Sequence, residues 1–130
     1  MTAAPDGPRP VVLVAEDEES VRSMIAMVLR AAGFEPVLCV DGLDAAEQIE
    51  SGVRVDAVLM DLRMPRLGGL ELVARLRQRP ESESLPVVAM SAYNDEVQER
   101  AARAAGADAF LAKPFTIAEL SRTLHGVLAR

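Results

Sequence analysis

Val58-Leu59-Met60-Asp61 is the stretch that decides the fold, and the turn residues Met64-Pro65 and Gly68-Gly69 follow it closely. A short apolar run that ends at a turn is typical of a strand buried on both faces of a parallel sheet. Asp61 is therefore expected at the carboxyl end of a central strand, where open α/β sheets bind their ligands. An Asp at a strand end also serves as a turn or helix-capping residue, and Asp61 alone does not decide between these uses.

The rest of the chain alternates between strand and helix patterns. Apolar runs predict strands at 10–15, 34–40, 55–60, 86–90 and 107–112. Helical spacing of apolar residues predicts a helix after each strand: from 21 to 32, from a cap at Asp41 to 51, from 70 to 79, from a cap at 94 or 95 to 105, and from a cap at Thr116 onward. This alternation predicts the α/β class, a doubly wound parallel sheet of five strands in the order 2-1-3-4-5, the flavodoxin-like (βα)5 arrangement.

Two details of this arrangement are also predicted. Pro36 interrupts the second strand, which favours a place at the edge of the sheet because proline cannot donate a ladder hydrogen bond. Apolar stripes on the helices are expected to face the sheet. On the first helix the stripe includes Met24, and on the third it consists of Leu70, Val73 and Ala74.

Length and composition exclude several classes of protein. The 130 residues suit one domain, expected over 10–130, and the net charge of −6 argues against the basic footprint of a nucleic-acid-binding protein. The single cysteine, Cys39, allows no internal disulfide and is expected to be a buried, unreactive thiol. No apolar run approaches the ~20 residues of a membrane span. Residues 1–9 lack the apolar core of a signal peptide and are expected to form a flexible tail, which favours a cytoplasmic protein.

Polar side chains follow four of the five expected strands. Strand one runs into Glu16-Asp17, strand three into Asp61, strand four into Ser91 and strand five into Lys113. In the order 2-1-3-4-5 these ends converge on one crevice. Crowded carboxylates repel one another, and an oxygen-only set of ligands favours Mg²⁺ as the balancing cation. A carboxylate surrounded by acids, a hydroxyl and an ammonium group predicts a phosphoryl-transfer site with an aspartyl nucleophile.

The same stretches resemble those of a known family. Val-Leu-Val-Ala-Glu16-Asp17, Leu-Met-Asp61-Leu-Arg-Met-Pro, Met-Ser91-Ala and Phe110-Leu-Ala-Lys113-Pro-Phe are similar to the motifs of response-regulator receiver domains, the CheY-like family of two-component signalling. The likeness runs from about Pro10 to the C-terminus. It implies that Asp61 accepts a phosphoryl group from a phosphohistidine of a histidine kinase or a histidine phosphotransfer protein.

The resemblance also implies the remaining site roles. Asp17, Asp61 and the backbone carbonyl of Arg63 would bind Mg²⁺ directly. Glu16 would bind it through water, although the family most often has Asp there. Ser91 and Lys113 would bind phosphoryl oxygens, and Lys113–Pro114 would be a cis peptide.

Further positions are implied in switching and in phosphoryl lifetime. Ser91 and Phe110 would form the switch that reshapes the face of the fourth helix, fifth strand and fifth helix. Arg63 and Tyr93 would set the phosphoryl lifetime, and we hypothesise that Tyr93 shields the phosphoryl group from water while Arg63 modulates access.

The resulting expectation is a single-domain response regulator whose own chemistry is limited to Mg²⁺-dependent self-phosphorylation and slow autodephosphorylation. It would contact no membrane and no nucleic acid, and would be a monomer or a dimer formed on phosphorylation. The sequence does not identify its downstream target. A receiver domain cut from a longer hybrid kinase or DNA-binding regulator is the alternative within the family, as is a degenerate receiver that takes no phosphoryl group.

Two further classes fit the residues less well. An aspartate-nucleophile phosphatase resembles a pattern with a second Asp two residues after the first, and Arg63 occupies that position. A nucleotide or flavin binder needs a glycine-rich phosphate loop after strand one, where this chain has Glu16-Asp17-Glu18.

Overall fold

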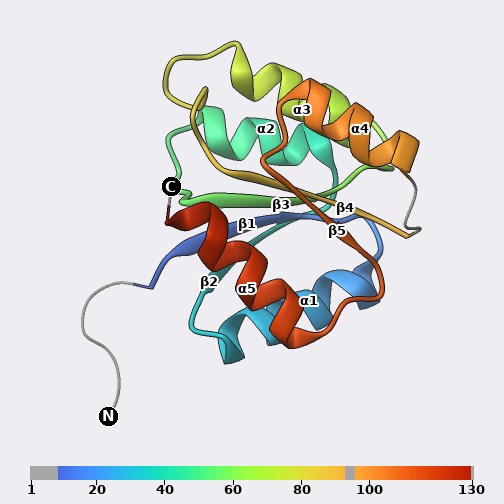
Figure 1. Ribbon diagram of the computed structural model, residues 1–130. Coiled ribbons are helices and arrows are strands. Elements are labelled where there is room, and N and C mark those ends of the chain that lie inside the picture. Colours follow the sequence, from blue (N-terminus) through green and yellow to red (C-terminus); the bar gives the residue numbers. More distant parts are fainter. Residues whose placement is uncertain (1–8, 93–95, 130) are drawn as a thin grey trace.

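A computed structural model describes residues 9–92 and 96–129. It contains one parallel sheet between two layers of helices (Figure 1). The strands are β1 (Val11–Ala15), β2 (Glu35–Cys39), β3 (Ala57–Asp61), β4 (Val87–Ser91) and β5 (Ala109–Ala112). The helices are α1 (Glu19–Ala31), α2 (Gly42–Glu50), α3 (Gly69–Arg77), α4 (Glu96–Ala105) and α5 (Ile117–Leu128).

The order of the strands is β2-β1-β3-β4-β5, and every neighbouring pair is parallel. Helices α1 and α5 cover one face of the sheet, while α2, α3 and α4 cover the other (Figure 1). The predicted fold is therefore confirmed, including the edge position of the strand that carries Pro36. The carboxyl ends of the strands lie at the right of the view in Figure 1.

Each central strand serves two cores. Leu13 of β1 and Val58 of β3 belong to a cluster with α2, α3 and α4. Val12 and Leu59, which are adjacent to these residues on the same strands, belong to a second cluster with α1 and α5. All four side chains are fully buried. Burial on both faces explains why these strands are uninterrupted apolar runs rather than alternating ones.

Several expected boundaries and faces were wrong. Strand β3 begins at Ala57 because Asp56 turns its carboxylate to the backbone N–H of Val11, at 2.7 Å. On α3 the buried residues are Leu72, Val73 and Leu76, whereas Leu70 and Ala74 are exposed. The buried positions of α3, which also include Gly69, are thus shifted by one residue from the expected stripe.

Two of the predictions concern residues outside the described part of the chain. Residues 1–8 and 93–95 carry the predicted tail and the cap at 94 or 95, which stay predictions.

Cys39 is fully buried, and burial raises the pKa of its thiol to about 12, as expected for an unreactive cysteine. Among the described residues, no helix has the length and apolar character needed to cross a membrane.

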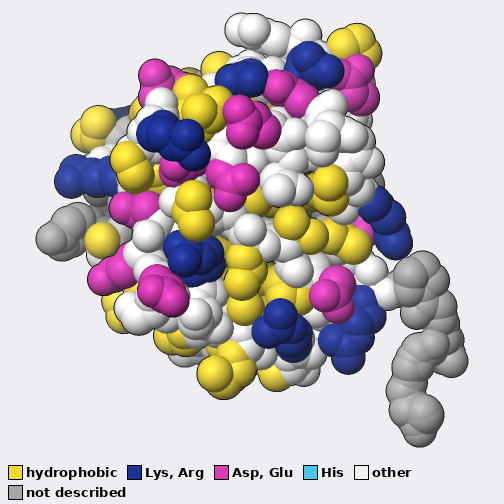
Figure 2. Space-filling model, turned by 180° about the vertical axis from the view of Figure 1, so that it is seen from behind, with side chains coloured by type: hydrophobic (Ala, Val, Ile, Leu, Met, Phe, Trp, Pro, Cys, Tyr) yellow, Lys and Arg dark blue, Asp and Glu magenta, His cyan; other side chains and the backbone are white. Residues whose placement is uncertain are grey.

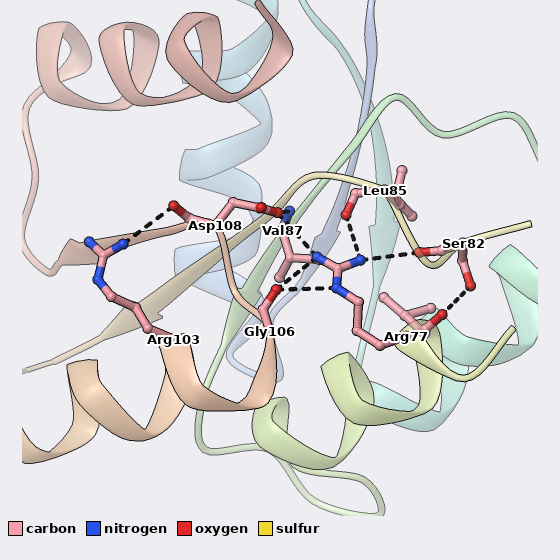
Figure 3. A network of polar contacts seen from close by, with 8 residues as sticks. Arg77, Ser82, Leu85, Val87, Arg103, Gly106 and Asp108 are labelled. Carbon is pink, nitrogen blue, oxygen red and sulfur yellow. Dashed lines mark hydrogen bonds and ion pairs between the residues drawn. The ribbon is translucent and has the colours of Figure 1, made fainter. Parts of the chain in front are cut away.

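A polar network joins four segments at the amino ends of β4 and β5 (Figure 3). Arg77, at the end of α3, donates to the carbonyl oxygens of Ser82, Leu85 and Gly106 at 2.8–3.2 Å. Its Nη2 also lies 3.1 Å from Oδ2 of Asp108, which accepts the backbone N–H of Val87 at 2.8 Å. This network lies at the end of the sheet opposite to the strand ends that carry the predicted site residues.

Candidate functional site

The register of β1 and β3 brings three carboxylates together. Ala15 is the partner of Met60, so Glu16 and Asp61, the next residues, come side by side at the carboxyl ends of adjacent strands. Glu16 is 1% exposed and Asp61 is 9% exposed, whereas Asp17 faces solvent. One carboxylate oxygen of each lies within 4.8 Å of those of the other two.

Lys113 lies between two of these acids. Its Nζ is 2.9 Å from Oδ2 of Asp61 and 3.0 Å from Oε1 of Glu16. The peptide bond between Lys113 and Pro114 is cis, as predicted. The backbone N–H of Lys113 donates to the carbonyl oxygen of Ser91 at 2.7 Å, which fixes the end of β5 against the end of β4.

Burial and charge act together on the two buried ionic groups. Burial raises the pKa of Glu16, and the hydrogen bond from Lys113 only partly offsets this effect. Burial would lower the pKa of Lys113, but its hydrogen bonds to Asp61 and Glu16 outweigh burial and raise it. The lysine therefore stays an ammonium ion at neutral pH, and it contacts two of the three clustered acids.

Backbone groups fix the orientation of the two buried carboxylates. The N–H of Arg63 donates to Oδ1 of Asp61 at 3.1 Å, and the N–H of Glu18 donates to Oε2 of Glu16 at 3.1 Å. Arg22 of α1 donates from Nη1 to the carbonyl oxygen of Glu16 at 2.8 Å. Sequence reasoning missed Arg22, because one arginine on a helix gives no signal of a bond to the backbone.

The other predicted site residues are placed as follows. Ser91 ends β4 and is buried, and its register partner on β5 is Ala112. Phe110 of β5 is half-buried and packs against the core cluster that contains α2, α3 and α4. Arg63 is exposed, and Tyr93 lies outside the described residues. The switch and lifetime roles of these residues stay predictions.

The acidic cluster fits a hard divalent cation. Its donors are carboxylate oxygens only, two of them on buried residues and one, on Asp17, open to solvent. Mg²⁺ is held in proteins by one or two carboxylates and keeps several water molecules, which requires a site with an open side. Glu16, Asp17 and Asp61 supply these features.

An apolar groove adjoins Lys113. A cavity of about 330 Å³ lies between α1, the end of β4 and the connection from β5 to α5, and its lining residues are Val21, Met24, Ala92, Lys113, Pro114 and Phe115. Met24 was expected to face the sheet, but its side chain is 50% exposed. Met27, one turn further along α1, is 68% exposed. The rim of the site therefore offers flexible apolar side chains to a partner.

Comparison with protein families gives a match over nearly the whole chain. The model of the response regulator receiver domain matches residues 12–125. The phosphate regulon transcriptional regulatory protein PhoB of Rhizobium meliloti is 35% identical over 121 residues, which are 93% of this chain and 53% of that protein. The response regulator MprA of Mycobacterium ulcerans is 39% identical over 120 residues, 92% of this chain and 50% of that protein. The chain thus spans about half the length of these curated relatives.

Solved structures give the same result. The receiver domain of the sensor histidine kinase PA1611 of Pseudomonas aeruginosa is 31% identical, with a TM-score of 0.87 over 95% of this chain and 100% of that one. That structure has a magnesium ion coordinated in its active site cleft. The chemotaxis response regulator CheY4 of Vibrio cholerae is 28% identical, with a TM-score of 0.86 over 92% of this chain and 99% of that one.

Proposed function

The chain belongs to the response regulator receiver domain family of two-component signalling, and from that premise we propose that Asp61 accepts a phosphoryl group from a phosphohistidine. The observation that carries this proposal is the position of Asp61. Its carboxylate lies at the end of a central strand, 2.9 Å from the Lys113 ammonium and within a cluster of acids. The chain would be the acceptor in this reaction and would supply its own catalytic groups, without acting on another substrate.

The transfer is a displacement at phosphorus. An oxygen of Asp61 forms a bond to phosphorus while the bond from phosphorus to the donor imidazole nitrogen breaks, and that nitrogen takes up a proton from solvent. The Arg63 N–H and Lys113 hold the Asp61 carboxylate in a fixed orientation before the transfer. Lys113 then pairs with a phosphoryl oxygen, and Ser91 donates its hydroxyl to another.

Mg²⁺ is the proposed cofactor, held by Glu16, Asp17, Asp61 and the backbone carbonyl of Arg63. When bound, it supplies positive charge to the phosphoryl oxygens, which carry the negative charge of the transition state. The contribution of the protein is the arrangement of acids that one lysine does not neutralise. The magnesium ion in the related PA1611 receiver domain supports this assignment.

The phosphodonor must reach Asp61 over the rim of the site. The groove beside Lys113, lined in part by the exposed Met24, is an apolar surface next to this rim. We therefore assign the groove to the side chains that flank the phosphohistidine of a histidine kinase or phosphotransfer protein. Cytoplasmic localisation follows from this choice of donor and stays a prediction.

The response of the domain would be a change in its binding surface. We propose that Ser91 and Phe110 pass the phosphorylated state to the face formed by α4, β5 and α5. DNA contact by the domain itself is not expected, because its net charge is −6. Figure 2 shows one face on which basic, acidic and hydrophobic side chains are interspersed. Transcriptional regulation is part of the name of the PhoB relative, of which this chain spans 53%.

The test is phosphoryl uptake from a small donor. The protein is incubated with acetyl phosphate and Mg²⁺ and weighed by intact mass spectrometry, beside Asp61→Asn and a sample with excess chelator. Glu81→Gln, which changes a carboxylate in an exposed ion pair with Arg79, serves as the matched control. We expect a gain of one phosphoryl group in the wild type and in the control, and none in the other two samples. A gain that persists in Asp61→Asn would refute Asp61 as the acceptor.

A further inference from the structure

The loop between β3 and α3, residues 62–68, lies directly on the first residue of α2. The N–H of Gly69 donates to the carbonyl oxygen of Leu62 at 3.0 Å, which closes the loop on itself. A Cβ atom on Gly42 would overlap the backbone carbonyl of Leu67, so only glycine fits at this crossing. The loop that carries Arg63 is therefore fixed against α2 by backbone contact.

Arg66, in the middle of this loop, has an unfavourable backbone conformation. Its φ is +68°, in the left-handed region that disfavours residues with a Cβ atom. The N–H of Leu67 donates to the carbonyl oxygen of Pro65 at 2.8 Å, so Arg66 is the centre of a three-residue turn. A γ-turn with positive φ is rare and strained, and it persists only where the surroundings hold it.

The side chain of Arg66 supplies such a restraint. Its Nε lies 2.6 Å from Oδ2 of Asp41 and its Nη2 lies 3.3 Å from Oδ1, a two-pronged ion pair. The Asp41 side chain is only 6% exposed, and its Oδ1 also accepts the N–H of Asp44 as the cap of α2. Asp41 is thus anchored to α2, and it holds the arginine from outside the loop.

We propose that Arg66 is a positioning residue of the phosphoacceptor site, because its ion pair with Asp41 holds the loop in the strained turn that places Arg63. The N–H of Arg63 orients the Asp61 carboxylate. Under the proposed function, the carbonyl of Arg63 is a metal ligand. The effect of Arg66 on metal binding therefore rests on the proposed function. The effect of Arg66 on the order of the loop depends only on its ion pair with Asp41.

The test compares two ion pairs of similar geometry. Arg75 binds Glu50 through two contacts of 2.8 Å and likewise connects the α3 side of the molecule to α2, but it does not touch the loop. Arg75→Ala is therefore the matched control for Arg66→Ala. Asp41→Asn removes the charge while keeping an N-cap residue, and Arg66→Lys keeps the charge without the two-pronged geometry.

Two quantities are measured for each protein: amide hydrogen exchange at Arg63 and Leu67 without metal, and Mg²⁺ affinity. We expect faster exchange at both amides in Arg66→Ala and Asp41→Asn, with Mg²⁺ bound about tenfold more weakly, the lower end for groups that support metal ligands. The double variant should lose no more than either single one, and Arg66→Lys should recover part of the loss. Arg75→Ala should match the wild type in both measurements.

Three results would overturn parts of this inference separately. Wild-type exchange rates in Arg66→Ala would refute the hold of the ion pair on the loop. Faster exchange with unchanged Mg²⁺ affinity would refute its role in placing the metal ligand. A wild-type protein that binds no Mg²⁺ would refute the proposed metal site, and the exchange rates would still decide whether the ion pair orders the loop.

Discussion

Lys113 is the only lysine in the chain, and the other basic residues, apart from His125, are arginines. At this position a compact ammonium has an advantage over a planar guanidinium. Its donors point in different directions from one atom, so it reaches both Glu16 and Asp61, which lie on different strands. Under the proposed function, the same property would let it exchange a carboxylate for a phosphoryl oxygen.

Replacing this lysine should affect stability and metal binding in opposite directions. In Lys113→Met the buried acids lose their cation, so without metal the free energy of unfolding should fall by about 2–4 kcal/mol. Mg²⁺ should bind more tightly, because a neighbouring positive charge is removed, and it should restore most of the stability. Urea unfolding with and without Mg²⁺ measures both effects, with Arg122→Met on α5 as the control. An equal loss of stability with and without Mg²⁺ would contradict this account.

Asp41 should make stability depend on pH in the acid range. The hydrogen bond from Arg66, opposed by burial, lowers the pKa of Asp41 below its ordinary value of 3.8. Its contribution to the free energy of unfolding is therefore present above about pH 3.8 and is lost as the pH falls through the folded-state pKa. We expect the wild type to exceed Asp41→Asn in stability at neutral pH, and the difference to shrink in strong acid. Urea unfolding at a series of pH values tests this, and a constant difference would refute it.

For single residues, the sequence predicts which side chains form the site better than it predicts the ion pairs that support the surrounding loop and helices. Glu16, Asp61 and Lys113 follow directly on predicted strands, so the topology alone brings them together. The pairs Asp41–Arg66 and Glu50–Arg75 each span 25 residues and join side chains of different βα units. No local pattern encodes such a pair, because its geometry depends on how α2 and α3 pack. Asp41 was predicted only as a cap, and Arg66 was not identified at all.

The glycines of helices α2 and α5 differ in the space available for a Cβ atom. Gly42 begins α2, where a Cβ atom would also come 2.8 Å from the carbonyl carbon of Leu67. Gly126 lies within α5, and a Cβ atom there would meet no atom within 4 Å. Replacing glycine by alanine should therefore lower the stability of the protein at one of these positions and raise it at the other.

Gly42→Ala should destabilise the protein by about 1–3 kcal/mol, because the loop must move to make room. Gly126→Ala should stabilise it by about 0.5–1 kcal/mol, since alanine loses less backbone entropy than glycine in a helix. Thermal or urea unfolding measures both, and Mg²⁺ titration should show weaker binding only for Gly42→Ala. A neutral Gly42→Ala variant would show that the loop yields easily, which would also count against its role in placing Arg63.

The type and order of the elements were predictable because burial leaves periodic patterns. Both-face burial produces the unbroken runs of β1, β3 and β4, and helical spacing marks α1 and α5. The details that failed depend on side chains that no period describes. Strand β3 starts two residues later than predicted, after Asp56 accepts the N–H of Val11. Helix α3 buries Leu72, Val73 and Leu76 and leaves Leu70 exposed.

In the whole molecule, two polar clusters lie at opposite ends of the sheet. The carboxyl ends of the strands hold an incompletely neutralised cluster of acids, while the amino ends of β4 and β5 hold the Arg77 network (Figure 3). Within the described part of the chain, the hydrogen bonds of Arg77 go to carbonyl oxygens and to Asp108, which suits a permanent structural bond rather than an exchangeable one. We therefore expect substitutions in the Arg77 network to change stability without changing the chemistry of the site.

Arg77→Ala tests this separation. The side chain is 21% exposed, and its loss would leave three partly buried carbonyl oxygens without this donor and Asp108 without its ion pair to Arg77, so the free energy of unfolding should fall by about 2–4 kcal/mol. Arg79→Ala is the matched control, because that arginine is 44% exposed and pairs with the exposed Glu81, an interaction worth about 1 kcal/mol or less. Mg²⁺ affinity and phosphoryl uptake, measured where each variant is fully folded, should equal those of the wild type. If Arg77→Ala weakened Mg²⁺ binding in the folded protein, the two ends of the sheet would be coupled, and the network at the amino ends would belong to the switch rather than to the structural support of the site.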